Sequence, residues 1–299
     1  MWLAFALLST FIFALIYLID DYCVEYILEK PWMGFCTSAL STSVIVVLIF
    51  PYIAYFINWN SISSQIIAIG LLAGACIQLS QLFYFQALSW SQTDTVAAYG
   101  NITPILVPIG QFLFFGDILP FHHYIGICIL ILASVGFYRM DNSLATRLHA
   151  FAAMMISCVI LSIAFVLEDL IYQQIAFLPG FLLTGVGIAL AGLLPIAIKG
   201  IRITLFRITL AKLKNVRIFL LAEVLNVMGI GFWAMSVNLG NPSHVAAIET
   251  MMPGMVFLLF IICQPQNSHI KKAASLITIT AVTKWILVGL MVYGVLLIQ

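Results

Sequence analysis

Residues 2–19 read WLAFALLSTFIFALIYLI, an apolar run without a charged side chain. About 20 such residues in a helix cross the hydrocarbon core of a bilayer. The whole chain shares this character: 64% of its 299 residues are hydrophobic, only 8% are charged, and the mean hydropathy is +1.15. A soluble domain carries about 25% charged residues, so this chain cannot build a surface that faces water on every side. We therefore expect a multi-pass integral membrane protein.

Nine further apolar runs follow the first. They are continuously apolar rather than alternating, which argues against a transmembrane β-barrel. The sequence predicts an all-α integral membrane protein with ten transmembrane helices. The first run lacks a basic segment and a cleavage site, so we expect it to remain as a helix rather than act as a signal peptide. The ten runs are residues 2–19, 32–57, 65–89, 95–115, 121–138, 148–171, 178–198, 218–239, 243–263 and 273–298.

The two halves of the chain match at an offset of 149 residues. Agreement of several short segments at one offset indicates a repeat, which divides the ten runs into residues 1–140 and 148–299. An odd number of spans in each repeat would place the two copies in opposite orientations in the membrane. Inverted repeats are a common transporter architecture, with the substrate site between the halves. The matching pairs are residues 84–88 (YFQAL) with 233–237 (WAMSV), 96–98 with 245–247 (both VAA), Pro104 with Pro253, and Asp20 with Asp169.

These segments resemble the drug/metabolite transporter superfamily, and specifically its EamA-type ten-helix members. The opening run with Asp20 resembles the family's first helix, and residues 84–88 with Pro104 and residues 116–117 (GD) resemble its third and fourth helices. The second half departs from the pattern, because residues 263–265 (CQP) replace the expected Gly-Glu step and Glu249 stands where the first copy has Gly100. The resemblance implies a carrier of small metabolites, often an exporter, with both termini in the cytoplasm.

Glu249 and Lys284 are charged residues well inside predicted spans, where charged groups are costly and usually functional. Glu249 precedes Pro253 in the ninth run, and Lys284 lies near the middle of the tenth. Their depths are comparable, so the two side chains are placed to neutralise each other. Glu249 is either a site for a substrate amine or a proton, with Lys284 as its counter-ion, or one half of a structural ion pair. The sequence leaves both interpretations open.

Neutral polar residues concentrate on the third, fourth, eighth and ninth predicted helices. We expect them to line a central cavity together with the first and sixth helices, although interhelical hydrogen bonds are an alternative role for each. Asp20 and Asp169 end the first and sixth runs, where they are candidates for a gate or for helix capping. The candidate site residues are Glu249, Lys284, Tyr84, Tyr99, Asn101, Gln78, Gln81, Asn226 and Trp233.

Other site types lack support in the sequence. The net charge of +1 gives no reason to expect nucleic acid, and the six cysteines form no CxxC pair, so we expect neither a metal site nor a cofactor. No HExxH or GxSxG motif and no deep pair of aspartates occurs, so we do not expect an enzyme. The basic segment 199–217 predicts either an amphipathic surface helix or a solvated loop.

Basic residues give a membrane orientation that conflicts with the family. They fall in the odd-numbered loops, which places those loops in the cytoplasm and both termini outside, the reverse of what the resemblance implies.

The predicted function is secondary active transport of a small metabolite, such as an amino acid, by alternating access. We expect export across a bacterial inner membrane, with protons as a candidate coupling ion. The alternative is a flippase or carrier for a lipid-linked or nucleotide-linked group. Such a substrate would favour lysine or arginine in the core, where only Lys284 occurs.

Overall fold

The computed structural model is helical and contains no strand among the residues that it describes. These are residues 1–26, 28, 30–57, 59, 62–91, 96, 99–100, 102–116, 118–139, 145–211, 216–263 and 279–298. The predicted all-α class is thus confirmed for this part of the chain. In the first half the helices are α1 (Trp2–Tyr26), α2 (Trp32–Phe56), α3 (Ser64–Leu88), α5 (Thr103–Phe115) and α6 (Phe121–Arg139).

The second half contains the remaining helices, one of which is a short 3₁₀ helix. The basic segment is helical from Lys199 to Ala211, as the amphipathic interpretation predicted, and its Leu205 packs on Met33 and Phe35 of α2. The elements are α7 (Ala145–Gln174), α8 (Phe177–Leu193), the 3₁₀ helix η2 (Leu194–Ala197), α9 (Lys199–Ala211), α10 (Val216–Leu239), α11 (Pro242–Glu249), α12 (Met252–Cys263) and α13 (Ile279–Ile298).

Within the described residues, five helices are long and apolar enough to cross a membrane, judged by length and composition. They are α1, α3, the part of α7 from Leu148, α8 continued by η2, and the part of α10 from Leu221. Four shorter apolar helices are Trp32–Leu48, Thr103–Phe115, Phe121–Ala133 and Val282–Ile298. The count of ten spans stays a prediction.

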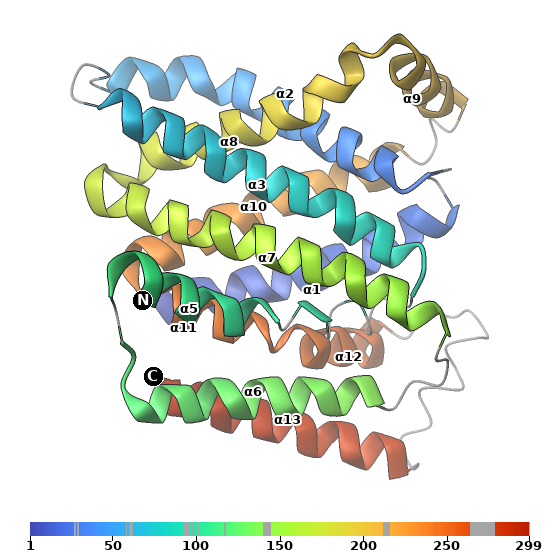
Figure 1. Cartoon of the computed structure of the whole chain (residues 1–299). Helices are drawn as coiled ribbons and strands as arrows, with labels where there is room; N and C mark the ends of the chain where they lie inside the picture. Colours follow the sequence, from blue (N-terminus) through green and yellow to red (C-terminus); the bar gives the residue numbers. More distant parts are fainter. Residues whose placement is uncertain are drawn as a thin grey trace.

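The helices lie side by side in a bundle (Figure 1). At its centre α3 packs between α7 and α8, and α1 packs along α10. The pair α6 and α13 forms one edge of the bundle, and α2 with α9 forms the opposite edge. Both termini lie at the same end of the molecule.

Helices α3 and α8 approach each other closely, backbone against backbone. A Cβ atom on Gly74 would meet the carbonyl oxygen of Thr184, and it would lie 2.7 Å from the backbone nitrogen of Ile188 and 2.9 Å from the Cα of Gly187. Glycine is the residue that permits such contact between helices in a membrane. These two glycines therefore hold α3 and α8 together without intervening side chains.

Helix ends differ from the sequence-based expectations in three places. Helix α1 continues to Tyr26, so Asp20 lies inside the helix rather than at its end. In the fourth run, α5 begins at Thr103 and Pro104 lies in its first turn, where a missing N–H costs no hydrogen bond. The ninth run is divided instead: α11 ends at Glu249 and α12 begins at Met252.

Candidate functional site

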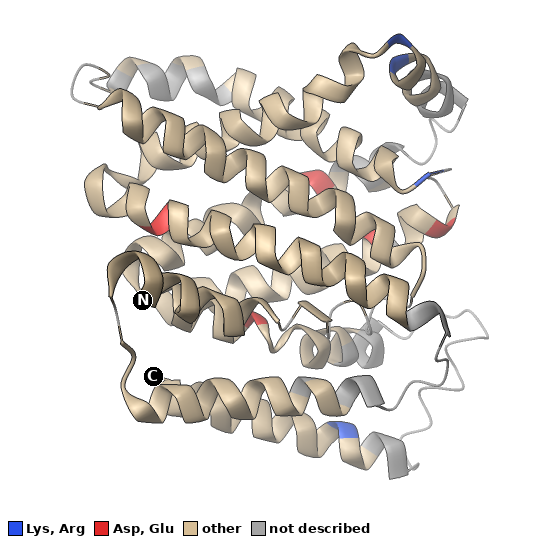
Figure 2. Ribbon diagram, viewed as in Figure 1, with Lys and Arg blue, Asp and Glu red and all other residues tan. Residues whose placement is uncertain are grey.

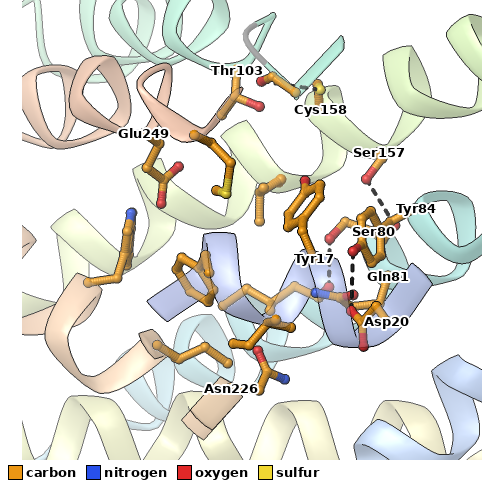
Figure 3. A pocket seen from close by; sticks show the side chains of 18 of the residues that line it. Tyr17, Asp20, Ser80, Gln81, Tyr84, Thr103, Ser157, Cys158, Asn226 and Glu249 are labelled. Carbon is orange, nitrogen blue, oxygen red and sulfur yellow. Dashed lines mark hydrogen bonds between the residues drawn. The ribbon is translucent and has the colours of Figure 1, made fainter. Parts of the chain in front are cut away.

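A cavity of about 150 Å³ lies among α1, α3, α7, α10 and the α11–α12 junction. One water molecule occupies on the order of 10–15 Å³ on such a measure, so the space fits a small organic molecule. Residues from both halves of the chain line it. Figure 3 shows its polar side chains, which include Tyr17, Asp20, Gln81, Tyr84, Asn226 and Glu249.

Glu249 forms one end of this cavity because α11 stops there. The amide N–H of Thr250 and its hydroxyl both bond to the Ala247 carbonyl, the hydroxyl at 2.7 Å, which closes the last turn of α11. The C-terminus of a helix carries a partial negative charge. The carboxylate of Glu249 adds to that charge and lines the cavity. This end of the cavity therefore favours a cation.

Trp233 faces the same space and supplies a donor. Its ring packs on Phe165 with a centroid separation of 4.0 Å, which fixes the position of the indole. The indole N–H is buried without a hydrogen-bond partner in the described part of the chain. An unsatisfied buried donor costs about 1–3 kcal/mol, a cost that a bound acceptor would remove.

Asp20 forms the other end of the cavity. It is 7% exposed, and the Tyr84 hydroxyl donates to its Oδ2 atom at 3.2 Å. Glu223 lies within electrostatic reach and interacts with Ser38 and Asn226. Tyr17 lies between the two ends, within electrostatic reach of both Asp20 and Glu249 (Figure 3).

The lining is negative in character. Asp20, Glu223 and Glu249 contribute three carboxyl groups, and the described lining residues include no lysine or arginine. Figure 2 shows the same separation at the scale of the molecule, with acidic residues along the central helices and the coloured basic residues toward helix ends. This arrangement suits a positively charged ligand better than an anionic one.

Five of the predicted site residues line the cavity: Tyr84, Gln81, Asn226, Trp233 and Glu249. Asp20, predicted as a gate or cap, lines it too. The capping alternative does not fit the burial of Asp20 or its bond to Tyr84.

Other predicted residues have structural contacts instead. Gln78 donates to the carbonyl of Phe35 at 2.7 Å and joins α3 to α2. Tyr99 is buried against Phe151, with ring centroids 5.2 Å apart. Neither residue lines the cavity.

Asp169 resembles Asp20 in burial but not in surroundings. It is 8% exposed and accepts hydrogen bonds from Gln111 at 2.8 Å and Gln173 at 3.0 Å. Both donors come from outside the cavity lining, and Asp169 is not part of it. The symmetric role expected for the two aspartates therefore does not extend to the cavity.

The structure does not bring Glu249 and Lys284 together. Glu249 lines the cavity, whereas Lys284 belongs to α13 and is absent from the described lining. Asn101, the remaining candidate, lies outside the described residues.

Three residues near the centre were not among the predicted site residues. Tyr17 and Glu223 line the cavity, and Glu168 on α7 is completely buried with neither carboxyl oxygen hydrogen-bonded in the described part of the chain. The same test that selected Glu249, an acid inside an apolar run, also selects Glu168 and Glu223. Tyr17 carried no such signal, because aromatic residues are common throughout this chain.

Comparison with known proteins agrees with this architecture. A solved structure titled only "Crystal structure of protein" matches with a TM-score of 0.63 at 12% identity, over 98% of this chain and 95% of the other. At that identity the likeness concerns the fold alone. No curated protein matches the sequence. Residues 1–139 match the model of the EamA-like transporter family, whose members are membrane transporters of the drug/metabolite type. Over residues 1–139, the chain is therefore similar to the EamA-like transporter family of the drug/metabolite transporter superfamily.

Proposed function

We propose that the protein is a secondary transporter for a small metabolite that carries an ammonium group, such as an amino acid. The observation that carries this proposal is the composition of the cavity, which has three carboxyl groups and no basic residue in its described lining. In the proposed cycle the substrate binds in this cavity and leaves on the opposite side of the membrane. We further propose export across a bacterial inner membrane, the direction and location expected from the sequence.

Glu249 would hold the substrate ammonium group. It is the carboxylate at the negatively polarised end of α11, and it lines the cavity. An amino acid also needs a donor for its carboxylate, and the unsatisfied indole N–H of Trp233 supplies one. The Asn226 and Gln81 amides complete a lining that can bind a zwitterion.

The packing of the helices supports two inverted five-helix repeats, residues 1–140 and 148–299. Under the 149-residue offset, the contact of α3 with α7 corresponds to that of α10 with α1. The contact of α5 with α7 likewise corresponds to that of α12 with α1. The offset exchanges α6 with α13, and it exchanges α2 with α8. Each of these two contacts therefore maps onto itself. All of these contacts are present.

One corresponding pair is unequal, which suggests how access would alternate. Helices α3 and α8 pack closely along their length, whereas α10 and α2 make far fewer contacts. In the proposed cycle the two pairs exchange these arrangements, so that α2 closes on α10 while α3 separates from α8. The cavity between them would then open to the other side.

A lipid-linked or nucleotide-linked substrate is less compatible with this cavity. Such substrates carry phosphate groups, which arginine and lysine bind best. The described lining has neither residue, and its three carboxyl groups would repel phosphate. The amine-bearing metabolite therefore remains the proposed substrate class.

The proposal is tested by binding and counterflow. Thermal-shift measurements on the purified protein with a panel of amino acids and polyamines identify a ligand, and counterflow of that labelled ligand into proteoliposomes measures transport. Glu249→Gln removes a charge-assisted hydrogen bond of about 1.5–3 kcal/mol, which is about 10- to 150-fold in affinity. Glu25→Gln on α1 is the control, since Glu25 is exposed. Equal counterflow by both variants would refute the role of Glu249.

A double variant separates substrate binding from a structural ion pair. If Glu249 only neutralised Lys284, then Glu249→Gln would strand a buried cation, and adding Lys284→Met would restore both stability and transport. We expect the double variant to remain without transport, because the ammonium site is absent. Full recovery of counterflow would support the structural role instead.

A further inference from the structure

We propose that Asp20 and Glu223 form a second site in this cavity, one that holds a single exchangeable proton where α1, α2 and α10 meet. Both side chains are more than nine-tenths buried, and both line the cavity. They lie within electrostatic reach of each other. Two neighbouring carboxyl groups in a buried site do not ionise together, so the pair retains one proton between them.

The site is equipped for one negative charge rather than two. Tyr84 donates to Asp20 at 3.2 Å, and Ser38 and Asn226 interact with Glu223. The Oε2 atom of Glu223 is buried and has no hydrogen-bond partner among the described residues. A proton on either carboxyl group would let one acid donate to the other, and it would remove the repulsion between them.

Other titratable groups around Glu223 do not replace this pairing. Besides Asp20, α1 presents the buried Cys23 thiol. The acids Glu168 and Glu249, from α7 and α11, act electrostatically on each other rather than on Glu223. From the described side chains of α2, the Ser38 hydroxyl interacts with Glu223. Asp20 is therefore the charged group on which Glu223 depends.

Because of where Glu223 lies, a proton on the acid pair would affect the packing of α2 against α10. At the 149-residue offset, Glu223 corresponds to Gly74 and Ser38 corresponds to Gly187. Gly74 and Gly187 are the glycines that bring α3 and α8 into backbone contact. At the positions where α3 and α8 have two glycines, α10 has the carboxyl group of Glu223 and α2 has the hydroxyl of Ser38. Helices α2 and α10 pack less closely than α3 and α8. Protonation of the acid pair would remove the charge that resists closure of α2 on α10.

This role in coupling rests on the proposed transport function, but the proton site does not, because it can be measured without substrate. The experiment follows the unfolding temperature of the purified protein in detergent between pH 6 and 9. A folded protein that retains a proton which the unfolded chain has lost becomes less stable as the pH rises. For one proton the expected fall is roughly 2–4 °C per pH unit. Glu168 and Glu249 are present in every variant, so only differences between variants are compared.

Removing either acid should flatten this dependence by the same amount. Glu223→Gln leaves Asp20 beside Tyr84 without a second carboxyl group, and Asp20→Asn leaves Glu223 beside Ser38 and Asn226 in the same way. Since the pair shares one proton, the double variant should be no flatter than either single variant. Glu25→Gln, the exposed control, should match the wild type.

Two results would overturn the proposal. If the double variant reduced the slope of unfolding temperature against pH by the sum of the two single reductions, the acids would titrate independently. A slope in Glu223→Gln equal to that of Glu25→Gln would mean that the pair holds no proton. If Glu223→Gln does not fold, the slope of Asp20→Asn against the same control decides the question. A failure of the ammonium assay with Glu249→Gln would leave these slopes unaffected, so the two proposals fail separately.

Discussion

Replacing Gly74 by alanine tests whether backbone contact holds α3 and α8 together. The added Cβ would lie 2.7 Å from the Ile188 nitrogen and 2.9 Å from the Gly187 Cα, and it would overlap the Thr184 carbonyl oxygen. Ordinary contacts of a Cβ atom begin at 3.4 Å. Because all three obstacles are backbone atoms, no side chain can rotate away, and the helices must separate by about 1 Å. Overpacking of this kind costs about 1–3 kcal/mol.

The control for this substitution is Gly289→Ala on α13, where a Cβ would meet nothing within 4 Å. Alanine improves helix propensity at both positions by up to about 1 kcal/mol, so the difference between the two variants isolates the steric cost. Thermal unfolding of the purified protein, followed by tryptophan fluorescence, measures it. At roughly 2–4 °C per kcal/mol, Gly74→Ala should unfold about 2–12 °C below Gly289→Ala. Equal unfolding temperatures would refute the inferred backbone contact.

Three further predictions concern contacts at other points of the bundle. Gln111→Leu removes the 2.8 Å hydrogen bond to the buried Asp169 and should cost about 1.5–3 kcal/mol of unfolding free energy; Gln174→Leu, at an exposed position, should cost nothing, and equal thermal stability would contradict the argument. His123 and His244 share one hydrogen bond of 2.8 Å between ring nitrogens, which requires an unprotonated acceptor. Acidification from pH 7.5 to 5 should therefore lower the unfolding temperature of the wild type more than that of His123→Ala, and parallel losses would argue against this. Trp233→Phe keeps the ring that packs on Phe165 but removes the indole N–H, so it should unfold normally while binding the identified ligand several-fold more weakly; unchanged affinity would exclude the indole as a ligand donor.

Composition and hydropathy were sufficient to predict helices, because the apolar character of each run is local. They could not predict where a helix ends inside the protein. The sequence placed Asp20 at the end of a span, where a carboxylate could reach water, yet α1 continues to Tyr26. The Tyr84 hydroxyl stabilises Asp20 there, and that contact joins residues 64 positions apart.

The candidate site was predictable in kind rather than in detail. Glu249 was identified because a carboxyl group inside an apolar run has a high energetic cost, and it lines the cavity. Gln78 had a similar signal, but its amide bonds to the Phe35 carbonyl on a neighbouring helix. A polar residue in a span satisfies its hydrogen bonds either with another helix or with a ligand. Only the packing of the helices distinguishes these cases.

The pairing of α6 with α13 has a consequence for biosynthesis. The two helices meet through small residues: a Cβ on Gly126 would lie 2.8 Å from the Gly294 carbonyl oxygen, and one on Gly136 would lie 2.6 Å from a Leu287 methyl carbon. Helix α6 is complete when residue 139 has been synthesised, but α13 ends only at residue 298. At 5–20 residues per second, α6 therefore waits roughly 10–30 s for its partner. During that interval its glycine face is covered by lipid or by the insertion machinery, and a ribosome that stops before residue 279 leaves the edge of the bundle unfinished.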